Sequence, residues 1–294
     1  MAEHEIRKIA IVGVGLLGGS AALAAKAHNP RVKVAGVGRR QVSLDAALAA
    51  GAIDSAHFDA AEAVRDADLV ILATPVGAFK NHLEAMTPAL PAEAIVTDVG
   101  STKAGVVRTG QRILGRGGQF VGSHPMAGSE FKGVAYSRAD LFAGATCIVT
   151  PTTDTPEDLV GRVERFWQTL GMRTVRMTPT AHDRAIGRVS HLPHALASLL
   201  MLLPSTADLG VSATGFRDAT RLAGGDPEMW RDIFLTNRVA VLGAIEKFSH
   251  SLVELRDLID RGDADGIEAL LTKAKTRRDS TIARLLQDRR ISAE

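Results

Sequence analysis

The stretch Gly13-Val14-Gly15-Leu16-Leu17-Gly18 decides the fold of this chain. It follows the β-branched run at residues 9–12 and precedes an alanine-rich segment, which predicts a strand, a tight turn and a helix from Gly19. Glycines in such a turn permit the close approach of a pyrophosphate, and the helix N-terminus offers N–H donors to its oxygens. We therefore expect a dinucleotide-binding turn. Its predicted contact residues are Gly13, Gly15, Leu16, Leu17 and Gly18.

Beyond this turn, β-branched runs alternate with helical patterns as far as about residue 176. The runs lie at residues 9–12, 32–35, 69–72, 95–97, 120–121, 147–149 and 174–175. Such alternation predicts a doubly wound, mostly parallel sheet. After Pro179 only helical periodicities continue, to Ile291. We therefore expect an α/β Rossmann domain over residues 1–178 and an all-α domain over residues 179–294.

The composition describes a globular chain with a small-molecule substrate. The 294 residues are 46% hydrophobic, and 35 basic against 33 acidic side chains give a net charge of +2. No block of like charge favours nucleic acid or a membrane surface, and no apolar run approaches the roughly 18 residues of a membrane span. The charged N-terminus and the single Cys147, in an apolar strand-like run, indicate a cytoplasmic protein without disulfides.

The helical half is unusually apolar. Residues 181–203 are apolar on much of their circumference, and apolar positions recur every three or four residues over 230–259. Helices of this kind, in a short domain, predict burial against a second copy of the chain. We expect a homodimer.

The residues after the second predicted strand bear on the choice of coenzyme. An enzyme that uses NAD usually has an acidic residue about 20 positions past the fingerprint, whereas this chain has Gly38-Arg39-Arg40. Arg39 and Arg40 could pair with a 2′-phosphate, which favours NADP and leaves NAD possible; the alternative is that they only begin a solvated helix. Thr74 and Pro75, at the end of the third run, should line the cofactor cleft.

Two segments of the first half carry candidate catalytic groups. His124 lies after the apolar run at 120–121 and before a Pro-Met-Ala-Gly sequence, so we expect it in a loop where its imidazole can accept a proton. Ser101 follows the strand predicted at 95–97 and precedes Lys103. Its hydroxyl could bond a carboxamide or a reacting hydroxyl, or could simply cap a helix.

The helical half carries candidate substrate-binding groups. Ser190-His191-Leu192-Pro193-His194 falls in an apolar helix that the proline should bend. Its histidines are three residues apart, but no further ligand cluster accompanies them, so we expect no metal. Arg217 and Arg221 suit a carboxylate, because guanidinium groups bind it through two parallel hydrogen bonds.

Together these motifs resemble the prephenate and arogenate dehydrogenase family of tyrosine biosynthesis, in its order and spacing over almost the whole chain. The motifs are GxGxxG at 13–18, Asp98-Val99-Gly100-Ser101-Thr102-Lys103, Ser123-His124-Pro125-Met126-Ala127-Gly128, Ser190-His191-Leu192-Pro193-His194 and Gly215-Phe216-Arg217-Asp218. The resemblance implies a Rossmann domain, a helical dimerisation domain and NAD(P)-dependent oxidative decarboxylation of a cyclohexadienol. The substrate would be prephenate, giving 4-hydroxyphenylpyruvate, or arogenate, giving tyrosine.

The resemblance also implies roles for particular residues. His124 would bond the substrate C4 hydroxyl and take its proton while hydride leaves C4, and Ser101 would position that hydroxyl and the nicotinamide. Arg221 would receive a substrate carboxylate. The other pocket positions that it implies are Ser190, His194, Trp230 and Glu130. We expect no mutase-like extension and no ACT domain, so inhibition by tyrosine would act through competition at the active site.

Two alternative functions are compatible with parts of the pattern. A β-hydroxyacid dehydrogenase or an imine-reductase-type NADP enzyme shares both halves, but it uses a lysine or aspartate of the helical domain and has no need of His124. A non-catalytic NADP-sensing module would keep the fold and release no carbon dioxide from cyclohexadienols.

Overall fold

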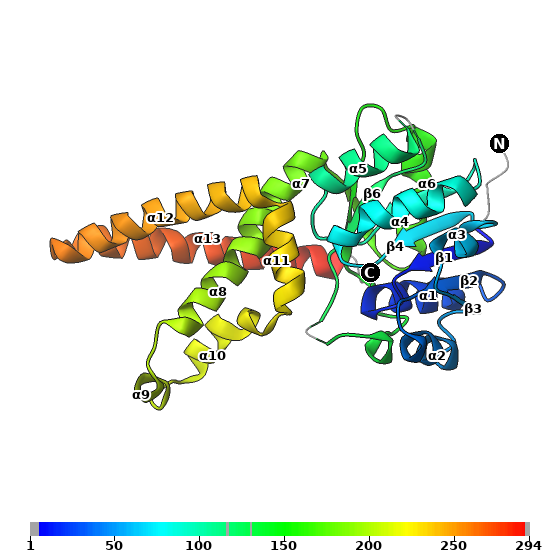
Figure 1. Ribbon diagram of the computed structural model, residues 1–294. Helices are drawn as coiled ribbons and strands as arrows, with labels where there is room; N and C mark the ends of the chain where they lie inside the picture. Colours follow the sequence, from blue (N-terminus) through cyan, green and yellow to red (C-terminus); the bar gives the residue numbers. More distant parts are fainter. Residues whose placement is uncertain (1–5, 116–117, 130, 292–294) are drawn as a thin grey trace. The chain divides into compact units, whose positions relative to one another are not determined.

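The computed structural model describes residues 6–115, 118–129 and 131–291, with side chains as far as residue 284. The chain divides into two compact units, residues 1–240 and residues 241–294. Figure 1 shows the order of the elements along the chain. The domain boundary expected after residue 178 is a different division from this one and stays a prediction.

The first sheet is parallel throughout and has the strand order β3-β2-β1-β4-β5. Its strands are β1 (Lys8–Val12), β2 (Lys33–Val37), β3 (Ser55–His57), β4 (Leu69–Leu72) and β5 (Ile95–Asp98). The helices between them are α1 (Leu16–His28), α2 (Gln41–Ala49), α3 (Ala60–Val64) and α4 (Phe79–Met86), with 3-10 turns η1 (Val76–Ala78) and η2 (Thr87–Ala89). This doubly wound order confirms the predicted Rossmann fold.

Both faces of this sheet are covered. Ile9 and Ile11 of β1 belong to one hydrophobic cluster, while Ala10 and Val12 belong to another. Successive side chains of a strand point to opposite faces, so a sheet buried on both sides needs continuous apolar strands. The short β3 has no β-branched residue and was not predicted from the sequence.

A second sheet follows, which corrects the expectation of a single sheet. It contains β6 (Gly122–Pro125), β7 (Thr146–Thr150) and β8 (Arg173–Arg176), with β6 antiparallel and β8 parallel to β7. The strand expected at 120–121 is displaced to β6, and Phe120 forms only an isolated parallel bridge with Val96. Helices α5 (Ala104–Leu114) and α6 (Glu157–Thr169) and the 3-10 turn η3 (Val134–Tyr136) complete this half. Cys147 lies buried in β7, as expected.

The chain is helical from Pro179 onward, as predicted. Thr178 caps α7 by accepting the N–H of Ala181, and Pro179 takes the first helical position. The elements are α7 (Pro179–Ile186), a π-helical turn η4 (Gly187–His191), α8 (Leu192–Leu202), α9 (Thr206–Leu209), α10 (Thr214–Thr220), η5 (Arg221–Gly224), α11 (Pro227–Thr236) and α12 (Arg238–Asp260). Pro193 occupies the first turn of α8, and the π turn directly before it adjusts the backbone.

The second compact unit consists of the remainder of α12 and of α13 (Ala264–Ile291). Gly262, with φ 63°, makes the turn between the two helices, because that backbone conformation suits glycine. Asp263 then accepts the N–H of Gly266 at the start of α13. Among the described residues, no helix is both long enough and apolar enough to span a membrane.

Candidate active site

The glycine turn between β1 and α1 has the geometry that a dinucleotide requires. Gly13 has φ 106°, and a Cβ there would lie 2.7 Å from the carbonyl carbon of Ala73. A Cβ on Gly18 would lie 2.3 Å from the carbonyl oxygen of Gly13, so this glycine lets helix and strand pack together. A Cβ on Gly15, in contrast, would meet no described atom within 4 Å. That open side at a helix N-terminus fits a pyrophosphate.

The backbone after this turn starts the helix earlier than predicted. The helix α1 begins at Leu16 instead of Gly19, and its first turn contains no acidic residue. Leu16 and Leu17 are half-buried against the core, so their side chains anchor the helix start. The first N–H groups of a helix have no acceptor within the helix, so those of α1 can bind an anion.

Thr74 and Pro75 directly follow β4, next to the glycine turn. The Thr74 hydroxyl oxygen is buried and has no hydrogen-bond partner among the described residues. A buried unpartnered hydroxyl next to Gly13 is what a bound ligand would satisfy, so this position fits a cofactor. Pro75 is exposed and precedes the turn η1.

Arg39 and Arg40 lie between β2 and α2, and both side chains are exposed. Arg40 is the N-cap residue of α2, so it does lie at the start of a solvated helix, as the alternative to a 2′-phosphate site required. Arg39 lies close enough to His82 to contribute, after burial, to lowering the pKa of that imidazole. No ion pair involves either arginine within the described part of the chain, so both guanidinium groups are available to an anion.

His124 lies in a strand, which corrects its predicted place in a loop. It is the third residue of β6 and pairs with Ile148 of β7. The sequence Gly-Ser-His-Pro has no β-branched residue, so the strand depends on pairing with β7 and not on local propensity. The side chain is 8% exposed. The strand therefore fixes the imidazole more firmly than the expected loop would.

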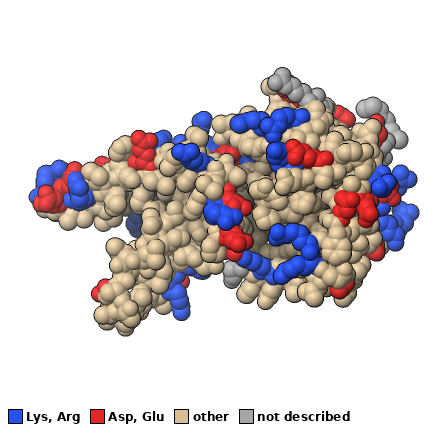
Figure 2. All heavy atoms as spheres, viewed as in Figure 1, with Lys and Arg blue, Asp and Glu red and all other residues tan. Residues whose placement is uncertain are grey.

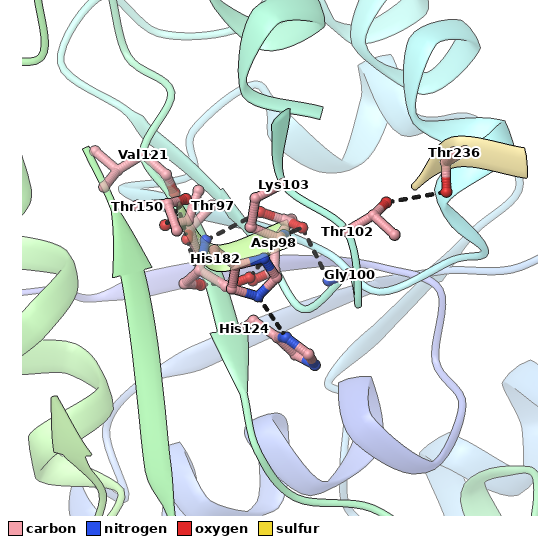
Figure 3. Close-up of polar contacts among 12 residues, drawn as sticks. Thr97, Asp98, Gly100, Thr102, Lys103, Val121, His124, Thr150, His182 and Thr236 are labelled. Atoms are coloured by element: carbon pink, nitrogen blue, oxygen red, sulfur yellow. Dashed lines mark hydrogen bonds and ion pairs between the residues drawn. The ribbon is translucent and has the colours of Figure 1, made fainter. Parts of the chain in front are cut away.

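A chain of hydrogen bonds connects His124 to the first helix of the helical half (Figure 3). His124 Nδ1 lies 2.8 Å from His182 Nε2, and His182 Nδ1 lies 2.8 Å from Asp183 Oδ1. Asp183 also accepts the N–H groups of Lys103 and Ala104, at 2.7 and 2.8 Å. The sequence reasoning missed both residues of α7. The adjacent His-Asp pair just after the Thr178-Pro179 helix start was the only local signal.

A buried ion pair contacts the backbone of β6 directly before His124. Lys103 Nζ contacts Asp98 Oδ2 and also donates to the carbonyl oxygen of Ser123, at 2.9 Å. Asp98 in turn accepts the N–H groups of Gly100 and Ser123, at 2.8 and 3.1 Å. These contacts, drawn in Figure 3, fix the peptide that precedes His124. The sequence assigns no role to Lys103 beyond its place after Ser101.

Ser101 lies in the loop between Asp98 and Lys103 and is half-buried. Helix α5 begins at Ala104 with Lys103 as its N-cap residue, so Ser101 does not cap it. The helix-cap alternative is therefore wrong. No hydrogen bond to the Ser101 hydroxyl occurs among the described residues, which leaves it available to a ligand. The adjacent Thr102 donates to Thr236 of α11, at 3.1 Å.

A second cluster of rings lies in the helical half. His194 of α8 stacks on Trp230 of α11, with ring centroids 3.6 Å apart and planes 7° apart. His191 meets the edge of the same indole, and its Nδ1 lies 3.0 Å from Asn237 Nδ2. Asn237 also donates to the carbonyl oxygen of Asp183, at 2.8 Å. This asparagine, which the sequence reasoning missed, connects the ring cluster to the chain that ends at His124.

Two ring nitrogens of this cluster have no partner. His191 Nε2 and His194 Nδ1 are buried without a hydrogen bond from any described residue. Unsatisfied buried nitrogens are costly, and a polar ligand would satisfy them. His194 and Trp230, two of the residues predicted for the substrate pocket, are in contact with each other.

The remaining predicted substrate residues are not drawn into this network. Ser190 is half-buried in the π turn, while Arg217 of α10 and Arg221 of η5 are exposed. No ion pair of either arginine occurs among the described residues, and both elements contact α8. Glu130 lies outside the described residues. Within those residues, no group of three potential metal ligands occurs.

The environment keeps the imidazoles of the site neutral near pH 7. Burial, followed by the charges of His182 and Lys103, lowers the pKa of His124 well below 6.5. Burial likewise lowers the pKa of His182, although its bond to Asp183 opposes this, and lowers that of His191 to about 4. For Asp183, hydrogen bonds from His182 and the backbone overcome the effect of burial and lower the pKa. A neutral histidine next to a charged aspartate results.

A dinucleotide-binding turn and a buried neutral imidazole are the two parts that a nicotinamide-dependent dehydrogenase needs, since oxidation of an alcohol requires a hydride acceptor and a base. Comparison with known proteins narrows this class. The family model of the prephenate dehydrogenase nucleotide-binding domain matches residues 21–176, and that of the prephenate dehydrogenase dimerization domain matches residues 178–273. The chain belongs to the prephenate dehydrogenase family, and the predicted family is confirmed.

Individual relatives are similar over most of their length. A cyclohexadienyl dehydrogenase of Zymomonas mobilis is 38% identical over 266 residues, which cover 88% of this chain and 90% of the relative. A prephenate dehydrogenase of Bacillus subtilis is 35% identical, with 92% and 75% covered. The crystal structure of prephenate dehydrogenase from Aquifex aeolicus with hydroxyphenyl propionate and NAD+ has a TM-score of 0.88 at 36% identity, with 94% and 99% covered. The chain is thus an oxidoreductase of this enzyme family.

Proposed function

We propose that this protein catalyses the NAD(P)-dependent oxidative decarboxylation of a cyclohexadienol, prephenate or arogenate, with His124 as the base. The observation that carries the proposal is the state of His124. Its imidazole is neutral and fixed through Nδ1, and its Nε2 has no partner among the described residues. The glycine turn of the same compact unit supplies a place for the coenzyme.

The proton balance of this reaction suits a single histidine. When bound, the nicotinamide accepts the hydride that leaves C4 of the substrate ring. His124 Nε2 takes the proton of the C4 hydroxyl, so that C4 becomes a carbonyl carbon. The bond between the ring and its carboxylate then breaks and carbon dioxide leaves. The electron pair of that bond stays with the ring and makes it aromatic. The proton returns from His124 to the phenolic oxygen, so no net proton is released and no second base is needed.

The other residues of the site bind and orient the substrate in this proposal. Ser101 has a free hydroxyl in the loop that leads to Lys103, which suits the positioning of the C4 hydroxyl. His194 and Trp230 form a stacked wall, and Ser190 lies one turn earlier on the same helical stretch. Arg221, supported by Arg217, is assigned to a substrate carboxylate, because an exposed guanidinium with no acidic partner among the described residues can bind an anion through two hydrogen bonds.

We propose NADP as the preferred coenzyme. Arg39 and Arg40 stand where an enzyme that uses NAD has a carboxylate for the ribose, and both are free of ion pairs among the described residues. The related protein from Aquifex aeolicus was crystallised with NAD+, so NAD is the competing choice. The variant Arg39→Ser/Arg40→Ser tests whether the two guanidinium groups determine this preference. Its kcat/KM for NADP should fall nearly to the value for NAD, while kcat/KM for NAD should change little.

We also propose that the protein is a homodimer. Apolar residues of α8 are exposed in the single chain, among them Leu199 and Leu202. Figure 2 shows few charged side chains over α8, whereas basic and acidic side chains are interspersed elsewhere on that face. A cytoplasmic location stays a prediction of the sequence.

One assay tests the function. Purified protein is given prephenate or arogenate with NAD or NADP, and reduced nicotinamide and released carbon dioxide are followed together. We expect equal amounts of both products, with the highest rate in an arm that contains NADP. If the protein oxidised β-hydroxyacids but turned over neither prephenate nor arogenate, the proposal would be reversed. Binding of NADPH without any carbon dioxide would instead support a sensing module.

A further inference from the structure

We propose that His182 and Asp183 are positioning residues that hold His124 in the tautomer with a proton on Nδ1 and a bare Nε2. This inference rests on the proposed function of His124 as the base. A neutral histidine carries only one ring proton, and it can serve as a base only at the nitrogen that lacks it. The tautomer therefore decides whether the nitrogen opposite His182 can accept a proton.

The assignment begins at Asp183, whose orientation is fixed. Its two carboxylate oxygens accept the backbone N–H groups of Lys103 and Ala104, at 2.7 and 2.8 Å. Peptide nitrogens can only donate, so they favour an ionised carboxylate, which can only accept. Asp183 is 5% exposed, and little solvent competes for it. Asp183 thus presents an acceptor, and no donor, to its neighbour His182.

The proton of His182 follows from that acceptor. His182 is fully buried, and its Nδ1 lies 2.8 Å from Asp183 Oδ1. A hydrogen bond at this distance needs one proton, which must sit on Nδ1 because the carboxylate has none. His182 is neutral, so its Nε2 carries a lone pair and accepts.

The same reasoning fixes His124. Its Nδ1 lies 2.8 Å from His182 Nε2, and two lone pairs at this distance would repel, so the proton is on His124 Nδ1. Nε2 is left bare. In Figure 3 this nitrogen lies on the side of the ring away from His182. When Nε2 takes the substrate proton, the resulting imidazolium keeps its bond to His182, and the Asp183 carboxylate stabilises the new charge through that ring.

The arrangement joins the two predicted halves of the chain. His124 belongs to β6, whereas His182 and Asp183 belong to α7, and Lys103 ends the loop that contains Ser101. Asp183 therefore binds the backbone of the Ser101 loop and orients the base at the same time. The groups that act electrostatically on His124 are His182 of α7, Lys103 before α5 and His191 of η4. Asp183 bonds His182, Asp98 of β5 contacts Lys103, and the Cys147 thiol of β7 lies near the backbone of His124.

Two variants of His182 separate positioning from mere packing. In His182→Gln the side-chain oxygen can reach the former position of Nε2 and accept from His124, while His182→Phe keeps a ring of similar shape with no acceptor. We expect His182→Phe to lower kcat by about 100-fold or more. His182→Gln should retain activity within about 10-fold of the parent, and the Kd of NADPH should be unchanged in both. Equal activity in the two variants, or loss of NADPH binding in both, would overturn the proposal.

The tautomer itself can be measured without substrate. Long-range proton–nitrogen spectra of histidine-labelled holoprotein, with His124 assigned by its absence in His124→Asn, should show a protonated Nδ1 and a bare Nε2 near neutral pH. In His182→Phe this preference should disappear. A bare Nδ1 in the parent would overturn the inference. Failure of the parent to turn over any cyclohexadienol would instead remove the proposed function, since the spectrum reports on the tautomer independently.

Discussion

At the scale of single residues, the chemistry depends on keeping one imidazole uncharged. His124 has three other histidine or lysine side chains near it. After burial, unfavourable electrostatic interactions of its protonated form with His182, Lys103 and His191 all lower its pKa. Its proposed function as a base is therefore present at neutral pH and is lost as the pH falls through a pKa that lies below 6.5.

Replacing this base should remove the reaction and leave the coenzyme site intact. In His124→Asn the amide can keep the hydrogen bond to His182 but cannot take a proton near neutral pH. We expect kcat to fall by about 10²–10⁴-fold, as measured by reduced nicotinamide in single turnovers. The control is NADPH binding, followed by its fluorescence. Turnover as fast as in the parent would contradict the role of His124.

The ion pair between Lys103 and Asp98 should influence the pKa of His124 electrostatically. Removing Lys103 alone would leave Asp98 buried and unpaired, so the informative variant is Asp98→Asn/Lys103→Met. Because Lys103 repels the imidazolium form of His124, its loss should raise the pKa of His124 toward 6.5. We expect the acid limb of the profile of kcat/KM against pH to move upward. A limb that stays in place would show that the Lys103 charge has no effect on the base.

Among the secondary-structure elements, the turn between β1 and α1 contains glycines with two different functions, one that leaves space for a ligand and one that allows close packing. Gly15 faces open space, whereas a Cβ on Gly18 would lie 2.3 Å from the carbonyl oxygen of Gly13. Gly15→Ala should therefore fold with nearly unchanged stability and lose affinity for the coenzyme, because the methyl group occupies the pyrophosphate side. Gly18→Ala should lower the melting temperature as well. Thermal unfolding without coenzyme and titration with NADPH measure the two effects, and equal melting temperatures would refute the distinction.

The same elements show what sequence can predict. The turn at 13–18 was recognisable because its glycines, its strand and its helix are contiguous. The strand β6 was predicted two residues too early, at 120–121, because Gly122-Ser123-His124-Pro125 becomes a strand only by pairing with β7, whose nearest residue is 21 positions later. His182 was missed for a related reason: it contacts His124 across 58 residues of chain, and nothing local to His182 identifies its partner.

At the scale of the whole molecule, the buried histidines link stability to pH. His191 is fully buried, with a pKa lowered to about 4, so the folded state binds fewer protons than the unfolded state as the pH falls from 6.5 to about 4. Stability must therefore decrease over this window, by about 3 kcal/mol for His191 alone. In His191→Asn, whose amide oxygen can take the place of Nδ1 and accept from Asn237, this dependence should be weaker. Chemical unfolding at a series of pH values tests this, and parallel curves for both proteins would contradict it.

The exposed leucines of α8 allow the proposed homodimer to be tested. Leu199 and Leu202 of α8 are 65% and 80% exposed in the single chain, and we assign them to the proposed dimer contact because exposed apolar patches favour association. Leu199→Lys/Leu202→Lys would place charges in the proposed dimer contact without disturbing a buried core. We expect the parent to sediment as a dimer and the variant as a monomer. Val42 of α2 is 76% exposed but lies on the Rossmann lobe, so Val42→Lys is the matched control and should stay dimeric. If both variants kept the mass of a dimer, α8 would not form the contact; if the parent itself were a monomer, the exposed leucines would need another partner.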